Sequence, residues 1–475
     1  MNTITIAWIA LPLFLGFVIY LLPKLDRYLA LGVVLVSVGY ALQLFFHQSP
    51  LILELLDNFG VILMVDQLSG YFILTNALVT AAVILYCWHT DKTAFFYTQT
   101  IILHGSVNAA FICADFISLY VALEVIGIAA FLLIAYPRTD RSIWVALRYL
   151  FVSNTAMLFY LIGAVLVYQA NHSFAFAGLS KAPTEAIALI FVGLLTKGGI
   201  FASGLWLPLT HSESETPVSA LLSGVVVKTG IFPLVRCALM VEEIDPIVRI
   251  FGVGTALLGV VYAVFEKDTK RTLALSTISQ LGWLLVAPGV AGFYALAHGL
   301  AKSTLFLIAG NLPSRNFKEL LDKPMNNPLW IALVMASLSI SGFPLFVGFG
   351  AKMLTLKNVV SWQAIAMNIG AVGTAIVYAK FIFLPHGKAK NVRPSFWPPM
   401  ILLLSALIAA SGMYYEAYTI ANITKVIVII GVGWLAHFLI FQRSIITLPR
   451  VLEQFEHLIG VMSLMLLLLL GMVLA

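Results

Sequence analysis

The sequence predicts an all-α polytopic membrane protein with about 14–16 transmembrane helices, and three observations lead to this fold class. Of the 475 residues, 61% are hydrophobic and only 10% are charged, whereas soluble domains are roughly 45–50% apolar. Apolar runs recur at about 20 residues, the length that a helix needs to cross the hydrocarbon core. Runs such as LMLLLLLGMVLA lack the polar–apolar alternation of a transmembrane β-barrel strand.

Apolar runs of transmembrane length follow one another along the chain. The first run has no basic residue before Lys24 and no small-residue cleavage pattern after it, which favours a retained span over a cleaved signal peptide. The segments between runs are too short for an aqueous domain, so functional residues should lie in helices or short loops. The expected spans are 4–23, 28–46, 67–88, 96–112, 114–135, 144–168, 186–206, 216–240, 248–265, 271–289, 291–312, 328–356, 361–384, 397–415, 420–441 and 456–474.

Loop cations predict the orientation of these spans. The odd-numbered loops hold most of the Lys and Arg residues outside the spans, and the even-numbered loops hold only Lys181, Arg249, Lys357 and Lys425. Because short cytoplasmic loops collect Lys and Arg, both termini should lie on the non-cytoplasmic side. The net charge of +6 then reflects topology and not a nucleic-acid surface.

Cysteine and histidine placement gives no sign of a redox centre. Cys87, Cys113 and Cys237 lack the spacing of a metal cluster or disulfide framework, and the nine histidines lack the repeated placement that haem ligation on facing helices requires. The cysteines are expected to be small packing residues. We expect no cofactor and no metal in this chain, so any electron transfer should occur elsewhere.

Seven cations lie inside apolar runs and need a separate explanation. Arg148, Arg236 and Lys380 lie near span ends, where long side chains can snorkel to the interface. The other four lie well inside a span or beside a helix break, where a charge costs on the order of 2.5–3.5 kcal/mol on translocon scales. These four are Lys197, Lys228, Lys302 and Lys352.

Glu124 is the acidic residue at the middle of a span, in ISLYVALEVIGIAAFLLIAY, and is the expected counter-ion of a buried lysine. Burial pushes a lone carboxylate and a lone lysine toward their neutral forms, and proximity pulls both back toward the charged pair. This competition can make a proton switch. A static ion pair that only fixes helix packing is the alternative, although it would leave the other lysines unpaired.

His298 and Lys302 stand four residues apart in YALAHGLAKSTLFLIAG, so they share one helical face and could relay a proton. A core histidine satisfied by a hydrogen bond is the alternative for His298. His104 and His437 also lie inside spans but have no second ionisable group at helical spacing, so they are expected to be packing residues.

Two spans contain small residues and proline beside a lysine: LTKGGIFASGLWLP around Lys197 and SISGFPLFVGFGAKM ahead of Lys352. In transporters, paired interrupted spans mark half-helices from internal repeats that face an ion site near the midplane. We therefore expect two broken helices with their lysines at equivalent places, although glycines often serve close packing instead. The expected break residues are Gly198, Gly199, Pro208, Gly342 and Pro344.

These motifs together resemble the antiporter-like subunits shared by respiratory complex I, its photosynthetic relatives and Mrp-type Na⁺/H⁺ antiporters. The resemblance covers about residues 60 to 385 and rests on the segments around Glu124, Lys197 and Lys228, on KRTLALSTISQLGWLL, and on the segments with His298, Lys302 and Lys352. It implies two inverted five-helix repeats, and it implies that Glu124, Lys197, Lys228, His298, Lys302 and Lys352 form half-channels and a proton relay.

The resemblance also implies a division of the chain and a set of partners. N-terminal helices would occupy 1–60, the first repeat region 61–240, the inverted second repeat region 241–385 and C-terminal helices 386–475. Partners would be the other membrane subunits of a hetero-oligomeric complex, with protons and Na⁺ as the candidate ions, in a prokaryotic cell membrane, a thylakoid or another energy-coupling membrane. The long lateral helix of the largest family members is absent from the sequence pattern. In this respect the chain is similar to the shorter D-type or N-type subunits. Lys352 stands where one branch of the family has a glutamate, which argues against that branch. A D-like subunit of a Mrp-type antiporter is favoured over a complex I subunit, with an ion-inactive scaffold as a further alternative.

The segment HSESET, which contains His211, Glu213 and Glu215, follows the expected break at Pro208. A metal site and a vestibule through which ions enter are both open interpretations, and the position beside the break favours the vestibule. An enzyme of lipid or quinone chemistry would need a polar catalytic cluster, and the sequence contains no H-E-x-x-H, G-x-S-x-G or P-loop motif.

Overall fold

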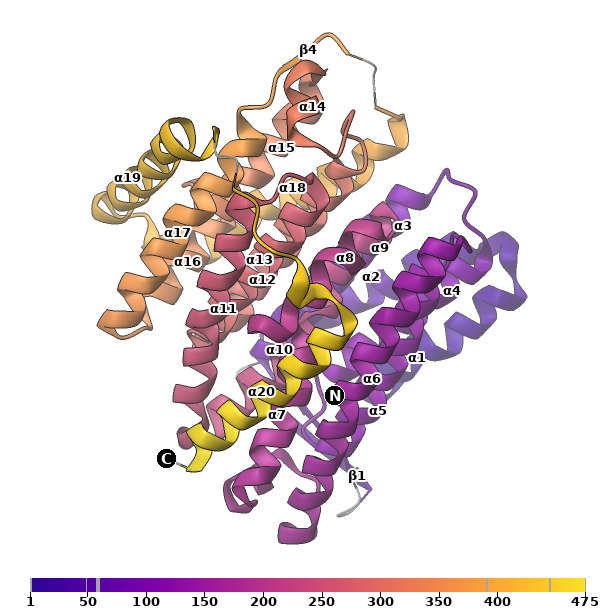
Figure 1. Ribbon diagram of the computed structural model, residues 1–475. Helices are drawn as coiled ribbons and strands as arrows, with labels where there is room; N and C mark the ends of the chain where they lie inside the picture. Colours follow the sequence, from indigo (N-terminus) through magenta and orange to yellow (C-terminus); the bar gives the residue numbers. More distant parts are fainter. Residues whose placement is uncertain (1, 48, 57–59, 390–391, 444–445, 475) are drawn as a thin grey trace.

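The computed structural model describes the whole chain except residues 1, 48, 57–59, 390–391, 444–445 and 475, and it is a bundle of membrane-length helices (Figure 1). Thirteen described helices are long and apolar enough to span a bilayer. The shorter α4, α12 and the α15–α16 pair lie at the remaining expected spans. The predicted all-α polytopic class is therefore confirmed.

The first half of the chain forms the helices on one side of Figure 1. Their ends match the expected spans to within a few residues. The bounds are α1 Asn2–Leu21, α2 Asp26–Leu44, α3 Gln67–Cys87, α4 Ala94–Ala110, α5 Phe116–Ile134, α6 Asp140–Asn171, α7 Thr184–Gly198, η4 Phe201–Trp206, α8 Leu207–Glu213, α9 Thr216–Leu221, η5 Leu222–Val226 and α10 Lys228–Met240.

The second half continues with further membrane helices and a short helix in a loop. Its bounds are α11 Asp245–Phe265, α12 Thr269–Leu285, α13 Ala291–Ala309, α14 Phe317–Asp322, α15 Asn327–Ser341, α16 Val347–Lys357, α17 Ser361–Ile382, α18 Trp397–Ala409, α19 Ile420–Ala436, η10 His437–Phe441 and α20 Phe455–Leu474.

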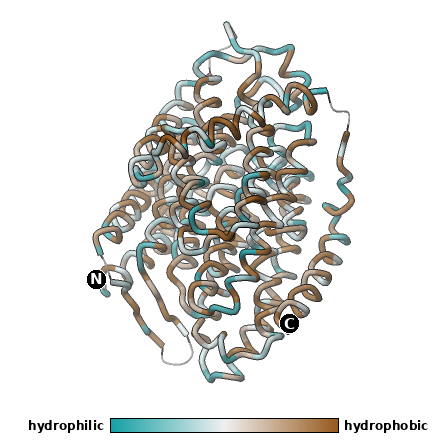
Figure 2. The backbone as a smooth tube through the Cα atoms, turned by 90° about the vertical axis from the view of Figure 1, so that its left-hand side faces the viewer, coloured by the Kyte–Doolittle hydropathy of each residue, from teal (hydrophilic) through white to brown (hydrophobic). Residues whose placement is uncertain are grey.

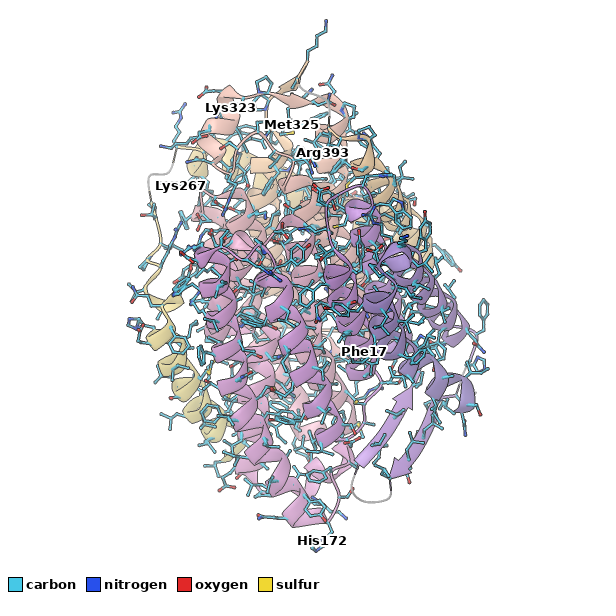
Figure 3. The ribbon with its side chains drawn as sticks, turned by 90° about the vertical axis from the view of Figure 1, so that its right-hand side faces the viewer. Phe17, His172, Lys267, Lys323, Met325 and Arg393 are labelled. Atoms are coloured by element: carbon cyan, nitrogen blue, oxygen red, sulfur yellow. The ribbon has the colours of Figure 1, made fainter. Side chains whose placement is uncertain are left out.

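A β-hairpin that the span count did not anticipate joins α2 to α3. Strands β1 (Leu51–Leu56) and β2 (Gly60–Val65) pair antiparallel, with Leu53 opposite Leu63. Each strand has only six residues, and such short apolar runs are ambiguous between strand and helix. Figure 3 shows the hairpin toward the end of the molecule that carries His172, opposite the end with Lys267, Lys323 and Arg393.

Burial divides the helices into an inner and an outer set. Every residue of α12 and α13 is buried, whereas most residues of α1, α2, α19 and α20 are at least partly exposed. Figure 2 shows the corresponding hydropathy, with brown outer helices and hydrophilic segments at the ends and within the bundle. An inner helix that is enclosed on all sides can carry polar residues away from lipid.

The C-terminal segment crosses the molecule after α19, which packs on α17. Helix α20 runs back along α7 and η4 (Figure 1, yellow). Before α20, the buried Glu453 carboxylate accepts a hydrogen bond of 2.5 Å from Arg271, and the Glu453 carbonyl accepts one from Arg148. Arg148 is therefore held by the C-terminal segment and does not snorkel, contrary to the expectation.

Arg236 and Lys380 also have protein partners in place of the expected interfacial water. Arg236 forms a bidentate ion pair with Asp66, in which Nη1 donates to Oδ2 at 2.5 Å and Nη2 donates to Oδ1 at 3.0 Å. Asp66 also caps α3 by accepting the Ser69 N–H. Lys380 donates to the carbonyls of Ala263 and Glu266 at 2.9 Å each, at the end of α11. The position of each cation near the end of its span could not predict these partners, because the partners belong to other helices.

The Asp66–Arg236 pair generates a stability prediction. Arg236 is 4% exposed, so Asp66→Asn leaves a buried guanidinium without its carboxylate, and loss of one partner of a buried pair costs about 3–5 kcal/mol. We expect a marked fall in the melting temperature of the purified protein. The matched control is Glu319→Gln in the exposed Glu319–Lys323 pair, which should change the melting temperature little.

The same pair sets a pH dependence. Burial raises the pKa of Asp66, but the hydrogen bonds and charge of Arg236 outweigh burial, and the net pKa lies below 3.8. A carboxyl whose pKa is depressed by folding stabilises the fold above its unfolded pKa and loses that effect as pH falls through the folded value. The melting temperature of the wild type should therefore fall below about pH 4, and that of Asp66→Asn should fall less steeply.

Candidate functional site

The helix that carries Lys197 is broken immediately after that lysine. Helix α7 ends at Gly198, and Gly199 adopts a left-handed conformation with φ 72°. The N–H of Ile200 bonds back to the Leu195 carbonyl at 2.8 Å, a helix-terminating pattern that favours glycine. A β-carbon at Gly199 would lie 2.4 Å from Leu207. The chain resumes as η4 and then as α8, with Pro208 as its second residue.

A second break of the same kind separates α15 from α16. Gly342 caps α15 with φ 88°, and the Phe343 N–H bonds to the Leu338 carbonyl at 2.9 Å. Pro344 lies between the two helices. A β-carbon at Gly342 would lie 2.9 Å from Cδ of Lys352, so the glycine also makes room for the lysine.

The two lysines do not occupy equivalent positions relative to their breaks, contrary to the expectation. Lys197 is in the last turn of the first half-helix α7, whereas Lys352 is in the second half-helix α16. Lys352 nevertheless extends back to the break, because its ammonium group donates to the Ser341 carbonyl at 3.2 Å. Both ammonium groups thus lie close to a helix interruption, although they reach it from opposite sides.

Lys228 follows a π-helical segment that no sequence pattern indicated. Between α9 and α10, residues 222–226 form η5, and π segments inside α-helices are frequent at functional sites. The Lys228 ammonium donates to the carbonyls of Gly224 at 2.5 Å and Ser223 at 3.4 Å. The irregular turn therefore supplies main-chain acceptors to a fully buried lysine.

The Lys197 ammonium is buried between α5, α6 and α7. Its ammonium donates to the Ser153 hydroxyl at 2.5 Å and to the Leu123 carbonyl at 3.1 Å. A β-carbon on Gly127 would stand 3.2 Å from the nitrogen. Glycine at 127 thus leaves space for the charged group.

Glu124 does not form the expected close ion pair. No acidic side chain of the described residues lies within 4.0 Å of Lys197, and one buried carboxyl oxygen of Glu124 has no hydrogen-bond partner among them. The Ser153 hydroxyl and the Leu123 carbonyl occupy the hydrogen-bonding positions around the ammonium instead.

Lys302 is fully buried in α13 and contacts α12 and α17. Its ammonium donates to the Leu273 carbonyl and to the Tyr378 hydroxyl, at 2.8 Å each. Tyr378 is in turn 2.9 Å from the Ser276 hydroxyl. This chain of hydroxyl groups could carry a proton away from the lysine. Tyr378 was not identified from the sequence, because no local pattern distinguishes it from other tyrosines inside the spans.

His298 lies one helical turn from Lys302, as predicted, and lines a small cavity together with Lys352. Both ring nitrogens of His298 are buried without a hydrogen-bond partner among the described residues. The cavity has a volume of about 10 Å³ and is lined also by Gln280, Tyr294 and Ser339. This is close to the smallest volume that holds one water molecule, which would bridge the imidazole and the ammonium.

The candidate residues fall into two groups. Lys197 and Glu124 form the first, with Ser153, and the second gathers Lys228, His298, Lys302 and Lys352 around α13. Among the described residues no hydrogen bond joins Lys197 to Lys228. Between them α7 packs so closely on α10 that a β-carbon at Gly230 would lie 2.3 Å from the Gly198 nitrogen.

All four interior lysines share one feature. Each is at most 4% exposed, each donates to at least one main-chain carbonyl, and none has a carboxylate within 4.0 Å in the part of the chain that the structure describes. A buried ammonium without a carboxylate favours release of its proton. The arrangement is therefore suited to loading and unloading protons.

The HSESET segment divides between the surface and the interior. Glu213 pairs with Arg141 at 3.1 Å and lines a polar cavity of about 460 Å³. Glu215 pairs with Lys92 at 2.6 Å and lines a second cavity of about 470 Å³ that also contains Lys270. His211 is fully buried behind them, with both ring nitrogens unpartnered among the described residues. The described residues contain no cluster of three His, Cys, Asp or Glu side chains that could hold a metal.

Lys270 and Arg271 lie at the start of the expected span 271–289 and are buried in the first turn of α12. Lys270 donates to the Ser214 carbonyl at 2.9 Å, and Arg271 pairs with Glu266 and Glu453. The signal that could have identified them is the segment DTKRTLALS, in which Asp268 caps the helix two residues before Lys270.

The structure is a bundle of membrane helices with two breaks and four buried lysines in its interior. A family model described as "NADH:quinone oxidoreductase/Mrp antiporter, TM" matches residues 113–377, more than half of the chain. The chain belongs to this family.

Curated relatives come from both branches of the family. The D subunit of the Na(+)/H(+) antiporter of Alkalihalophilus pseudofirmus is 25% identical over 440 residues, covering 82% of this chain and 88% of the relative. The N subunit of the NADH-quinone oxidoreductase of Desulforudis audaxviator is 29% identical over 380 residues, covering 70% and 76%. NAD(P)H-quinone oxidoreductase chain 4-2 of Synechocystis sp. is 29% identical over 443 residues, covering 82% and 78%.

Two solved structures share the fold. A chain of the membrane-bound sulfane sulfur reductase, an archaeal respiratory membrane complex, superposes with a TM-score of 0.78 at 21% identity, covering 92% of this chain and 100% of that one. A chain of the Mrp complex from Dietzia sp. DQ12-45-1b gives a TM-score of 0.76 at 19% identity, covering 97% and 100%. Both neighbours are chains of multisubunit membrane complexes.

The break at Gly342 generates a prediction. Gly342→Ala places a β-carbon in a left-handed conformation, which costs roughly 1–2 kcal/mol, and presses it on Lys352. We expect a lower melting temperature of the purified protein. The matched control is Gly431→Ala in α19, where nothing lies within 4 Å of the new β-carbon. This control should leave the melting temperature nearly unchanged, and an equal change in both variants would contradict the assigned role of the glycine.

Proposed function

We propose that this chain is a proton-translocating or Na⁺/H⁺-translocating antiporter-like subunit of a multisubunit membrane complex. The observation that carries the proposal is the set of four buried lysines held by main-chain carbonyls, three of which lie beside irregular helix segments. Membership of the antiporter family supports the same conclusion.

The geometry suggests how protons would move within each group. In the second group, His298 would exchange protons with Lys302 along one face of α13 and with Lys352 through a water in the intervening cavity. Tyr378 and Ser276 would extend the path from Lys302. In the first group, Ser153 would take part in the release of a proton from Lys197.

Transfer between the two groups requires a further step. Lys197 and Lys228 lie on α7 and α10, which are in tight glycine contact, so a direct hydrogen-bonded path would need hydration of the seam or a change in side-chain position. The breaks after Gly199 and Gly342 are the natural points for such a change, because hinge motions concentrate at the ends of elements. Glu213, Glu215 and His211 would form the vestibule from the surface cavities toward Lys302.

We favour a D-like subunit of a Mrp-type cation/proton antiporter. Two observations support this form: Lys352 at the last relay position, and similarity to the D subunit of an antiporter over 82% of this chain. A proton-pumping subunit of a quinone oxidoreductase is the second candidate, because relatives of that kind are at least as similar in sequence. Reconstituted vesicles containing the purified complex would distinguish the two. A pH change driven by a Na⁺ gradient alone is expected, and a pH change that requires quinone reduction would favour the second candidate.

Lys197→Ala is the direct test of the relay. Loss of the ammonium removes the titrating group between Ser153 and Leu123, so ion-driven pH change in vesicles should fall by on the order of tenfold or more, with the complex still assembled. The matched control is Lys425→Ala, an exposed lysine in α19, which should transport normally. Unaltered transport in Lys197→Ala would remove the relay hypothesis and favour an ion-inactive scaffold.

A further inference from the structure

A cavity lined by lysine and aromatic side chains lies between α11, α14, α17 and η10, away from the candidate relay residues. Its volume is about 170 Å³. Lys267, Lys318 and Lys380 contribute its basic groups. Lys267 lies toward the end of the molecule that also carries Lys323 and Arg393 (Figure 3), the end that the distribution of loop cations predicts to be cytoplasmic.

The charges around this cavity are unbalanced. Lys267 and Lys318 form no ion pair within the described residues. Lys380 uses two of its three N–H bonds on main-chain carbonyls, which do not neutralise its charge. The Glu266 carboxylate also lines the cavity, but Arg271 and Arg450 already pair with it at 3.0 Å each. The cavity therefore presents net positive charge to an occupant.

The walls of the cavity are apolar, and they continue onto the face of the bundle. Phe265, Phe317 and Phe441 line the interior. Phe383 and Phe438 line it as well, contact each other with ring centroids 4.8 Å apart, and are 41% and 42% exposed. An occupant would therefore meet both ammonium groups and an aromatic surface, part of which is exposed.

We propose that this cavity binds the headgroup of an anionic phospholipid, with its acyl chains along the Phe383–Phe438 surface. A phosphate would meet Lys267, Lys318 and the remaining N–H of Lys380, and basic pockets between membrane helices on the cytoplasmic side suit such headgroups. The charge and the apolar walls together favour a lipid over a soluble anion, which would leave the aromatic surface uncovered. The proposal does not depend on the ion that the protein transports.

The test uses the full-length protein in detergent, with lipid adducts counted by native mass spectrometry. Phosphatidylglycerol should bind in preference to phosphatidylcholine. In the double variant Lys267→Gln/Lys318→Gln, the ratio of phosphatidylglycerol to phosphatidylcholine binding should be about tenfold lower, because each lysine near an anionic headgroup contributes to binding. The matched control Lys323→Gln/Lys388→Gln removes two exposed lysines outside the cavity and should retain the preference.

Several results would overturn the proposal. Equal binding of the two lipids by the wild type would show that the cavity does not select an anion. An equal loss of lipid preference in the double variant and in its control would show that overall surface charge, and not this cavity, attracts the lipid. Displacement of the bound lipid by inorganic phosphate at the same concentration would assign the site to a soluble anion. The melting temperature of each variant verifies that the fold is intact.

Discussion

The structure depends on how buried ammonium groups are accommodated without carboxylates. Lys197, Lys228, Lys302 and Lys352 all lie within a bundle whose outer surface is apolar, where a full charge without hydrogen bonds would be very costly. Backbone carbonyls meet part of that need, and hydroxyl groups of Ser153 and Tyr378 add to it. Such neutral partners stabilise an ammonium less than a carboxylate does, so the charged and neutral forms remain closer in free energy.

Irregular helix geometry supplies several of these partners. A regular α-helix uses its carbonyls internally, but the π-helical turn before Lys228 and the break at Gly342 present carbonyls to a side chain. The same irregular segments explain the glycines: Gly342 permits a left-handed residue and clears the path of Lys352. The irregular backbone therefore provides both the carbonyl acceptors and the space for the lysines beside it.

Ion pairs are placed outside this interior. Asp66–Arg236 ties α3 to α10, and Glu266, Arg271 and Glu453 tie the end of α11 and the start of α12 to the segment before α20. Paired charges near the ends of helices tie the bundle together, whereas the four interior lysines have no carboxylate within 4.0 Å among the described residues. The C-terminal helix α20 also packs on α7 and η4, so the periphery holds the broken helix that carries Lys197.

Hydrophobic length and charge in the sequence determined the fold class, the approximate ends of the spans and the identity of the interior lysines, because burial in lipid places strong local demands on composition. The glycines at both helix breaks could also be predicted from the sequence, since a left-handed residue at the end of a helix favours glycine. Only the tertiary structure decided which groups meet. Glu124 could pair with Lys197 by sequence, yet Ser153 and Leu123 take that place. Arg148 and Arg236 found partners on other elements, and the row of lysines divided at the contact of Gly198 with Gly230. These outcomes follow from helix packing between segments far apart in the chain, which no local pattern encodes.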